Sequence, residues 1–125
     1  MSTAVHAVAG LLLIAHGLVH LLYLAPDVTE FDPQRSWIVP TAARRPVSVA
    51  LMVATVGAFA LLGLAVWGVP VVRDAWPAIA VAASLCSLLL LGAFWNARLL
   101  LGVTIDAAVL MIAWLEPPWS QDLLG

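Results

Sequence analysis

Four runs of about twenty apolar residues, separated by short polar or proline-bearing breaks, constrain this chain more than any other feature. The runs cover residues 4–25, 47–67, 77–95 and 97–115. A helix needs about 20 apolar residues to cross a hydrocarbon core of about 30 Å. Inside lipid the backbone must satisfy its own hydrogen bonds, so segments of this length form helices. The sequence therefore predicts an all-α, polytopic membrane protein, in which four transmembrane helices form one antiparallel bundle over residues 1–125.

The composition agrees with a chain whose main partner is the lipid bilayer. It is 64% hydrophobic and 10% charged, whereas soluble domains have about a quarter of their residues charged. A formal net charge of -2 leaves no basic face, so a nucleic-acid-binding role is excluded. The chain also lacks the glycine-rich phosphate loop, the dinucleotide fingerprint and the nucleophile elbow, which excludes a catalytic cycle driven by ATP within it.

The only sizeable predicted loop covers residues 26–46 and is rich in proline. Aromatic residues favour membrane interfaces, and they fall near both ends of the predicted helices. The arginines are distributed unequally: four belong to the side of the long loop (Arg35, Arg44, Arg45 and Arg98), and Arg73 belongs to the side of both termini. Because positively charged loops tend to stay in the cytoplasm, we expect the long loop inside and both termini outside.

The first predicted helix carries three histidines on one face. At about 100° per residue, His6, His16 and His20 fall within an arc of about 80° that also includes or borders Gly10 and Gly17. Small residues let membrane helices approach closely, so this face should pack against other helices. We therefore expect His16 and His20 to point into the bundle, and His6 to lie in the wet interface near the N-terminus.

The fourth predicted helix carries a carboxylate, Asp106, at its midpoint. An ionisable residue at that depth is costly and usually marks a functional site. Gly102 shares the face of Asp106 and offers another position of close approach. In an antiparallel bundle His16 lies at nearly the same depth, so the two residues are predicted to pair.

Several interpretations of this pair remain open. A hydrogen bond between His16 and Asp106 could simply fix the register of the helices. His16, His20 and Asp106 could bind a metal, because histidines at positions i and i+4 on a helix can share one ion. The same residues could bind a quinone, a lipid or another small amphiphile. Haem is less favoured, because two haem ligands usually come from facing helices and all three histidines here share one helix.

The remaining polar and thiol residues inside the predicted helices have a structural interpretation. Ser84 and Ser87 share one face of the third helix, and Cys86 lies beside them. Serines in membrane helices commonly bond to their own backbone or to a neighbouring helix. We interpret the two serines as packing residues and the cysteine as a small hydrophobic residue.

The stretches "AHGLVHLLYL" and "AFWNARLLLGVTIDAAVLMIAWL" resemble a family of small four-helix bacterial membrane proteins with an HGxxH motif, some of which are labelled permeases without a defined function. The motif maps to His16, Gly17 and His20. Members of this family often have an amide where this chain has Asp106. A looser likeness is to DoxX-like four-helix proteins, some of which are associated with quinone-linked oxidoreductases. Both resemblances imply a multi-pass protein of the bacterial inner membrane.

Three functional hypotheses follow. The first is binding, or the handling of a proton or ligand, at an intramembrane site made by His16, His20 and Asp106. The second is a non-catalytic subunit that docks on a larger membrane complex or forms a homo-oligomer. The third is a small redox or isomerase-type membrane enzyme. No residue is assigned a catalytic role on this basis.

Overall fold

The computed structural model describes residues 1–25 and 27–124, and every regular element in that part of the chain is a helix. Four segments are long and apolar enough to cross a membrane: Thr3–Leu24, Thr41–Val66, Trp76–Ala93 and Ala97–Leu115. The predicted all-α bundle of four helices is confirmed. This architecture indicates a multi-pass membrane protein.

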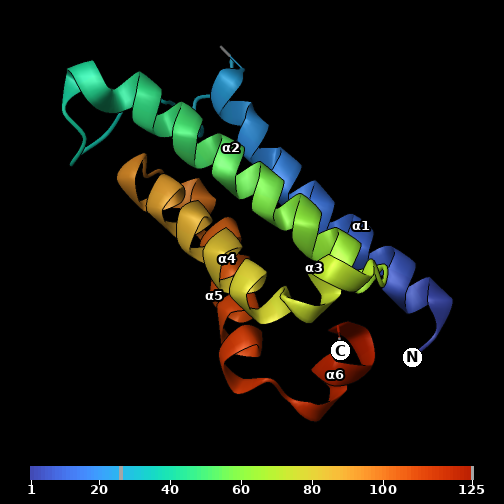
Figure 1. Ribbon diagram of the computed structural model, residues 1–125. Coiled ribbons are helices and arrows are strands. Elements are labelled where there is room, and N and C mark those ends of the chain that lie inside the picture. Colours follow the sequence, from blue (N-terminus) through green and yellow to red (C-terminus); the bar gives the residue numbers. More distant parts are fainter. Residues whose placement is uncertain (26, 125) are drawn as a thin grey trace.

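The helices follow one another in a simple antiparallel order (Figure 1). Helix α1 (Thr3–Val19) continues into the 3-10 helix η1 (His20–Leu24), and α2 (Thr41–Val66) returns beside it. The short α3 (Pro70–Asp74) turns the chain into α4 (Trp76–Ala93). A 3-10 turn, η2 (Ala97–Leu99), then leads into α5 (Leu100–Leu115), and α6 (Pro118–Leu124) ends the chain.

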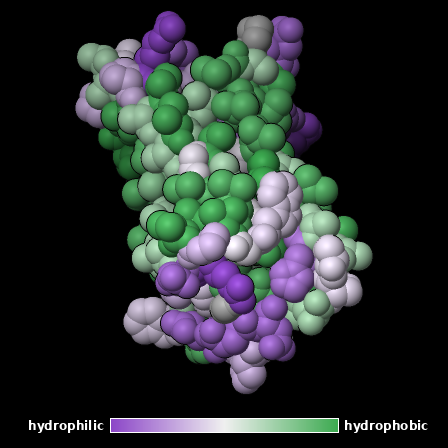
Figure 2. Space-filling model, turned by 45° about the vertical axis from the view of Figure 1, so that its right-hand side comes forward, coloured by the Kyte–Doolittle hydropathy of each residue, from purple (hydrophilic) through white to green (hydrophobic). Residues whose placement is uncertain are grey.

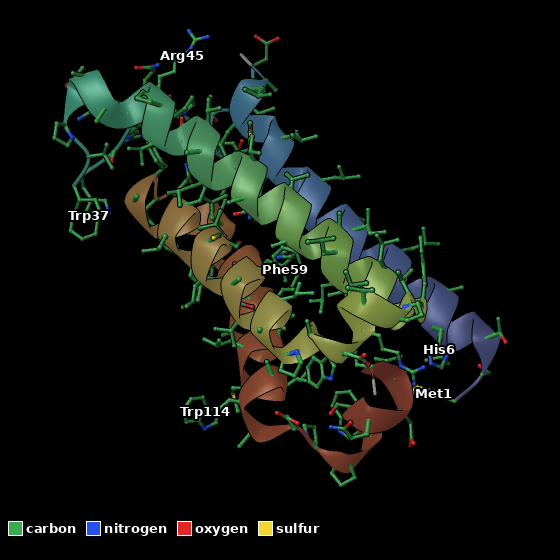
Figure 3. The ribbon with its side chains drawn as sticks, viewed as in Figure 1. Met1, His6, Trp37, Arg45, Phe59 and Trp114 are labelled. Atoms are coloured by element: carbon green, nitrogen blue, oxygen red, sulfur yellow. The ribbon has the colours of Figure 1, made fainter. Side chains whose placement is uncertain are left out.

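The two ends of the bundle differ in what they carry. At one end, called here the loop end, residues 27–40 connect η1 to α2, and η2 connects α4 to α5. The other, the terminal end, holds both termini and α6 (Figure 1). Trp37 and Arg45 lie at the loop end, whereas Met1, His6 and Trp114 lie at the terminal end (Figure 3).

The surface is what a lipid environment requires. Large apolar side chains are widely exposed, among them Leu12 at 65%, Leu101 at 72% and Trp114 at 83%. On the face drawn in Figure 2, hydrophobic residues form a band across the middle of the molecule, and polar residues are gathered toward its two ends. Monomeric soluble proteins rarely expose apolar patches of this extent, so the band is the part of the surface that faces hydrocarbon.

The helices pack as a row, with α1 against α2, α2 against α4, and α4 against α5. Helices α1 and α5 are the edges of this row. In the described part of the chain their facing sides enclose a groove that contains two pockets. The groove, rather than a closed core, positions the site described below.

The second helix begins earlier than the sequence predicts. Residue 47 was the expected start, but α2 begins at Thr41 and contains Pro46, so the loop ends at residue 40. Arg44 explains the extension, because its guanidinium donates hydrogen bonds to the carbonyl oxygens of Gln34, Ser36 and Val39 and ties the first helical turn to the loop. These bonds hold the turn in place although Pro46 removes one backbone donor.

The short helices α3 and α6 were also missed, because runs of five and seven residues are too short to show a helical period. Pro118, expected only to end the fourth helix, is the first residue of α6, a position where the missing N–H of proline costs nothing. Glu116 makes the reversal before it with a left-handed backbone (φ 40°). As a result α6 folds back over the terminal end of the bundle (Figure 1).

Candidate functional site: a buried histidine–aspartate network

The structure brings together the three residues that the sequence singles out. His16 comes from α1, His20 from the start of η1, and Asp106 from the middle of α5. The Nε2 atom of His16 lies 2.8 Å from Oδ1 of Asp106. Asp106 is fully buried, His20 is 1% exposed, and the His16 side chain is 10% exposed. The site is therefore an enclosed cluster with one member that reaches its surface.

Glycines at the helix contacts let the helices approach closely enough to form this cluster. A Cβ atom on Gly17 would lie 2.7 Å from Cβ of Phe59, which shows how near α2 approaches α1. The ring of Phe59 packs edge-on against His16 at 4.8 Å between centroids. Gly10 is in contact with the indole of Trp67, and Gly102 with Leu91 of α4. The three glycines thus lie where neighbouring helices or their side chains come closest.

Ser87 of α4 is the member of the site that sequence reasoning missed. Its Oγ lies 2.5 Å from Oδ2 of Asp106 and 2.7 Å from Nε2 of His20. The expectation that Ser87 serves only as a packing residue is incomplete, because its hydroxyl joins the two ionisable groups. The sequence does contain one indication of this role, because Ser87 lies near the centre of the third apolar run, at a depth similar to that of Asp106 and His16. Cys86, beside it, is partly buried and has no role in the network.

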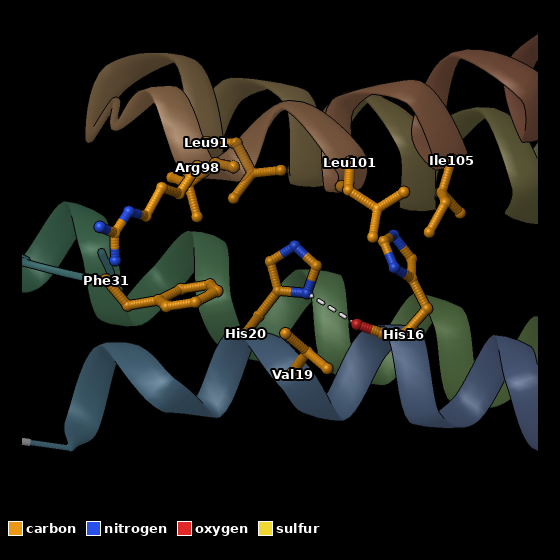
Figure 4. Close-up of a pocket in the computed structure, with 10 residues that line it drawn as sticks. His16, Val19, His20, Phe31, Leu91, Arg98, Leu101 and Ile105 are labelled. Atoms are coloured by element: carbon orange, nitrogen blue, oxygen red, sulfur yellow. Dashed lines mark hydrogen bonds between the residues drawn. The ribbon is translucent and has the colours of Figure 1, made fainter. Parts of the chain in front are cut away.

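The protonation of His20 follows from its partners. Its Nδ1 atom lies 3.1 Å from the carbonyl oxygens of both His16 and Gly17, and the first of these contacts is drawn in Figure 4. Carbonyl oxygens can only accept hydrogen bonds. Nδ1 of His20 therefore carries a proton, and Nε2 faces Ser87.

Two proton arrangements satisfy the remaining contacts, because the Ser87 hydroxyl has one hydrogen to donate. In the first, Ser87 donates to an Asp106 carboxylate and receives a bond from a His20 imidazolium. In the second, Ser87 donates to a neutral His20 and receives a bond from a protonated Asp106. Both contain the same number of protons, so the contacts among Asp106, Ser87 and His20, called here the relay, permit one proton to lie at either end.

His16 connects this relay to open space. Both arrangements allow Nε2 of His16 to donate to Asp106, and in that tautomer Nδ1 is the lone-pair side of a neutral ring. No hydrogen bond joins Nδ1 to a protein group within residues 1–25 and 27–124. His16 and His20 line a pocket of about 260 Å³ between α1 and α5, called here the polar pocket (Figure 4). A molecule in this pocket can therefore reach the relay through one imidazole.

One end of the polar pocket lies at the loop end of the bundle. Arg98 lines it, and Nη1 of Arg98 donates to Oε1 of Glu30 at 2.6 Å. Hydrogen bonds from the backbone N–H of Glu30 itself and from Arg98 hold the pKa of the Glu30 carboxyl below its ordinary value. Phe31, next in the chain, lines the same pocket and packs edge-on against Tyr23. The loop is thus fastened beside this end of the pocket by an ion pair and an aromatic contact.

The fit of the cluster to a metal can be tested on its donor atoms. One ligand atom from each of His16, His20 and Asp106 lies within 4.8 Å of the others. Zinc binds such atoms at about 2.0–2.2 Å, but Nε2 of His16 is already hydrogen-bonded to Asp106, and Nε2 of His20 is bonded to Ser87. A metal held by these three residues would have to replace the bond between His20 and Ser87, and also the bond between His16 and Asp106 if it binds His16 through Nε2. Haem has even less support, because both site histidines come from the same helical segment.

Three other polar residues lie apart from the network. His6 is at the terminal end, where its ring nitrogens contact the carbonyl oxygens of Ser2 and Asp122. Ser84 and Thr55 are fully buried, and their hydroxyls have no hydrogen-bond partner in the described part of the chain. None of these residues contributes to the polar pocket.

Searches against protein-family models, curated proteins and solved structures find no match to this chain. The function is therefore argued from the geometry of the site.

Proposed function

We propose that this protein binds a membrane amphiphile with a hydroxyl or carbonyl head, the chemistry of a quinol or quinone, and exchanges a proton with it through His16. The observation that carries this proposal is the position of His16. One ring nitrogen is bonded to the buried Asp106, the other has no hydrogen-bond partner in the described part of the chain, and the His16 side chain lines a pocket of about 260 Å³. An imidazole that joins a buried carboxylate to a ligand pocket is suited to move protons.

The proton transfer balances in the arrangement with an Asp106 carboxylate and a His20 imidazolium. A ligand hydroxyl gives its proton to Nδ1 of His16, and the proton on Nε2 moves to Oδ1 of Asp106. The products are a ligand oxyanion, a neutral His16 protonated on Nδ1, and a neutral Asp106. The negative charge has moved from Asp106 to the ligand, where the Nδ1–H of His16 and the nearby His20 imidazolium stabilise it.

The membrane setting extends the proposal. The resemblance of the "HGLVH" segment to small bacterial membrane proteins supports a place in the bacterial inner membrane. The excess of arginines at the loop end supports a cytoplasmic loop and external termini. A ligand dissolved in the bilayer would then enter sideways between α1 and α5, whose packing against each other is incomplete.

Binding of a decyl-benzoquinol to the purified protein in lipid nanodiscs tests the proposal. His16→Gln retains a donor for Asp106 but cannot take up a proton. His6→Gln is the matched control outside the polar pocket, and its amide retains a donor for the Asp122 carbonyl oxygen. We expect wild type and His6→Gln to bind with a pH-dependent affinity, and His16→Gln to bind at least several-fold more weakly with a flat pH profile. Equal binding and equal pH dependence in the three proteins would overturn the proposal.

Metal binding is a second candidate, favoured by the short distances among the three possible ligand atoms. Elemental analysis of protein purified without chelators tests it. A stoichiometric metal that is lost in both His20→Ala and Asp106→Ala would replace the amphiphile proposal. If neither a metal nor a quinol binds, a stoichiometric protein partner recovered in mild detergent would favour the accessory-subunit role.

A further inference from the structure

A second pocket lies in the same groove between α1 and α5, nearer the terminal end. It has a volume of about 250 Å³ and is called here the apolar chamber. Its walls are aliphatic side chains and two tryptophans, including Ala9 and Leu12 of α1, Val109 of α5, Trp76 of α4 and Trp119 of α6. This lining offers no group that could bind a polar head.

The chamber continues the polar pocket along the same helix faces. On α1, Leu12 lies one helical turn before His16, and on α5, Val109 lies one turn after Ile105, which lines the polar pocket. The bond between His16 and Asp106 is at the junction of the two pockets. Asp106 is fully buried and the His16 side chain is 10% exposed, so a ligand that spans both pockets would pass on the exposed side of this bond.

Helix α6 closes the far end of the chamber. Trp119 and Leu124 of α6 line it, and Leu124 is buried against the core. His6 of α1 contacts the carbonyl oxygen of Asp122, which fastens α6 to the first helix. The groove is thus polar at one end, apolar along the other half, and capped.

We propose that the apolar chamber holds the hydrocarbon chain of the amphiphile whose head occupies the polar pocket, an inference that rests on the proposed function. The size of the chamber supports this occupant. Its volume of about 250 Å³ exceeds that of a dry cavity of about 150 Å³, which is large enough to hold benzene. The ligand lies parallel to the helices, with its head toward the loop end and its chain toward the terminal end.

The expected contribution of the chain is modest. Lipid is as apolar as the chamber, so the chain gains close packing but no release from water. We expect the chain to improve binding about five-fold over the same head without a chain, the size of effect that added dispersion contacts give.

The test uses two probes in nanodiscs: a benzoquinol with a brominated decyl chain, and the same quinol with a methyl group in place of the chain. Bromine quenches tryptophan on contact. We expect the brominated chain to quench a component of the fluorescence that Trp119→Phe removes and Trp37→Phe leaves in place, since Trp37 is at the loop end.

Matched Ala→Phe variants on one helix test the chamber by filling it. Ala9→Phe projects into the chamber, whereas Ala15→Phe projects from an exposed position on α1 that lines neither pocket. We expect Ala9→Phe to abolish the advantage of the decyl chain and Ala15→Phe to retain it. Val109→Phe, compared with Ala108→Phe, repeats the test from the opposite wall should Ala9→Phe fail to fold.

The outcomes separate this inference from the proposed function. If both quinols bind in a His16-dependent way but Ala9→Phe and Ala15→Phe behave alike, the chain site is overturned and the head site stands. If a brominated decanol quenches Trp119 while no quinol binds, the chamber still takes a chain and the quinol assignment fails. If brominated nanodisc lipid quenches Trp119 and the quinol does not displace it, a bilayer lipid fills the chamber and the inference is overturned.

Discussion

His16 of α1 and Asp106 of α5 are joined by a 2.8 Å hydrogen bond across a groove where their two helices are otherwise apart. The bond therefore performs two tasks. It fixes the two edges of the bundle at one depth, and it connects a buried carboxylate to a pocket. The structural and the proton-handling interpretations of the pair are distinguished by variants that retain the bond but change its protons.

Asp106→Asn is the sharpest of these variants. The asparagine oxygen can accept from His16, its amide can donate to Ser87, and Ser87 can donate to His20, so every contact of the second proton arrangement is retained. We expect the free energy of unfolding to change by less than about 1 kcal/mol, since hydrogen bonds between membrane helices contribute little more than this. The same variant should lose the proton uptake linked to quinol binding, measured with a pH indicator.

Asp106→Leu is the control for that result. It removes all acceptors at this position, leaving His16 Nε2 without a partner and Ser87 with His20 alone, which should cost about 1–3 kcal/mol. Unfolding by a denaturing detergent, followed by circular dichroism, measures both variants. If Asp106→Asn destabilises the protein as much as Asp106→Leu does, a charged pair is required for folding and the shared-proton arrangement is wrong.

The sequence predicts the site better than it predicts the connections of the fold. Each of His16, His20 and Asp106 could be found because an ionisable residue inside an apolar run is conspicuous. Their proximity could be predicted because an antiparallel order places the midpoints of the first and fourth helices at one depth. The four spans could be predicted because the length and the hydropathy of each apolar run are local properties of the sequence.

Features that depend on tertiary contacts could not be predicted. Ser87 resembles any packing serine until α4 places its hydroxyl between Asp106 and His20. The early start of α2 depends on Arg44 reaching three loop carbonyls, which no local pattern reveals. The groove exists because the row of helices does not close between α1 and α5, and this is a property of the whole packing arrangement.

Gly17 provides a direct test of the contact between α1 and α2. A methyl group at this position would lie 2.7 Å from Cβ of Phe59, so Gly17→Ala must push α2 away from His16. Overpacking of this kind costs about 1–3 kcal/mol, and we expect a lower unfolding midpoint together with weaker quinol binding. Gly57→Ala on α2 is the control, because nothing lies within 4 Å of its added methyl. Equal stability of the two variants would show that α1 and α2 are less closely packed than described.

The Glu30–Arg98 ion pair predicts a pH-dependent contribution to stability. The pKa of Glu30 is below its ordinary value of 4.5, so its contribution to stability is present above about pH 4.5 and is lost as the pH falls through the lower value in the folded state. Wild type should therefore melt above Glu30→Gln at pH 6, and the two midpoints should converge toward pH 3. In an Arg98→Gln background this difference should shrink, because a principal partner of the carboxylate is gone. A difference that does not change with pH would contradict the assignment.

The direction in which the bundle is inserted into the membrane depends on charge rather than on packing. Four arginines lie at or near the loop end, and Arg73 alone lies between α2 and α4 at the terminal end. Thr29 and Gln121 are exposed at opposite ends of the bundle. In a Cys86→Ala background, we expect an impermeant maleimide added to intact bacterial spheroplasts to label Gln121→Cys and to leave Thr29→Cys unlabelled until the membrane is permeabilised. The reverse pattern would place the loop outside, and would show that a force other than arginine distribution orients the bundle.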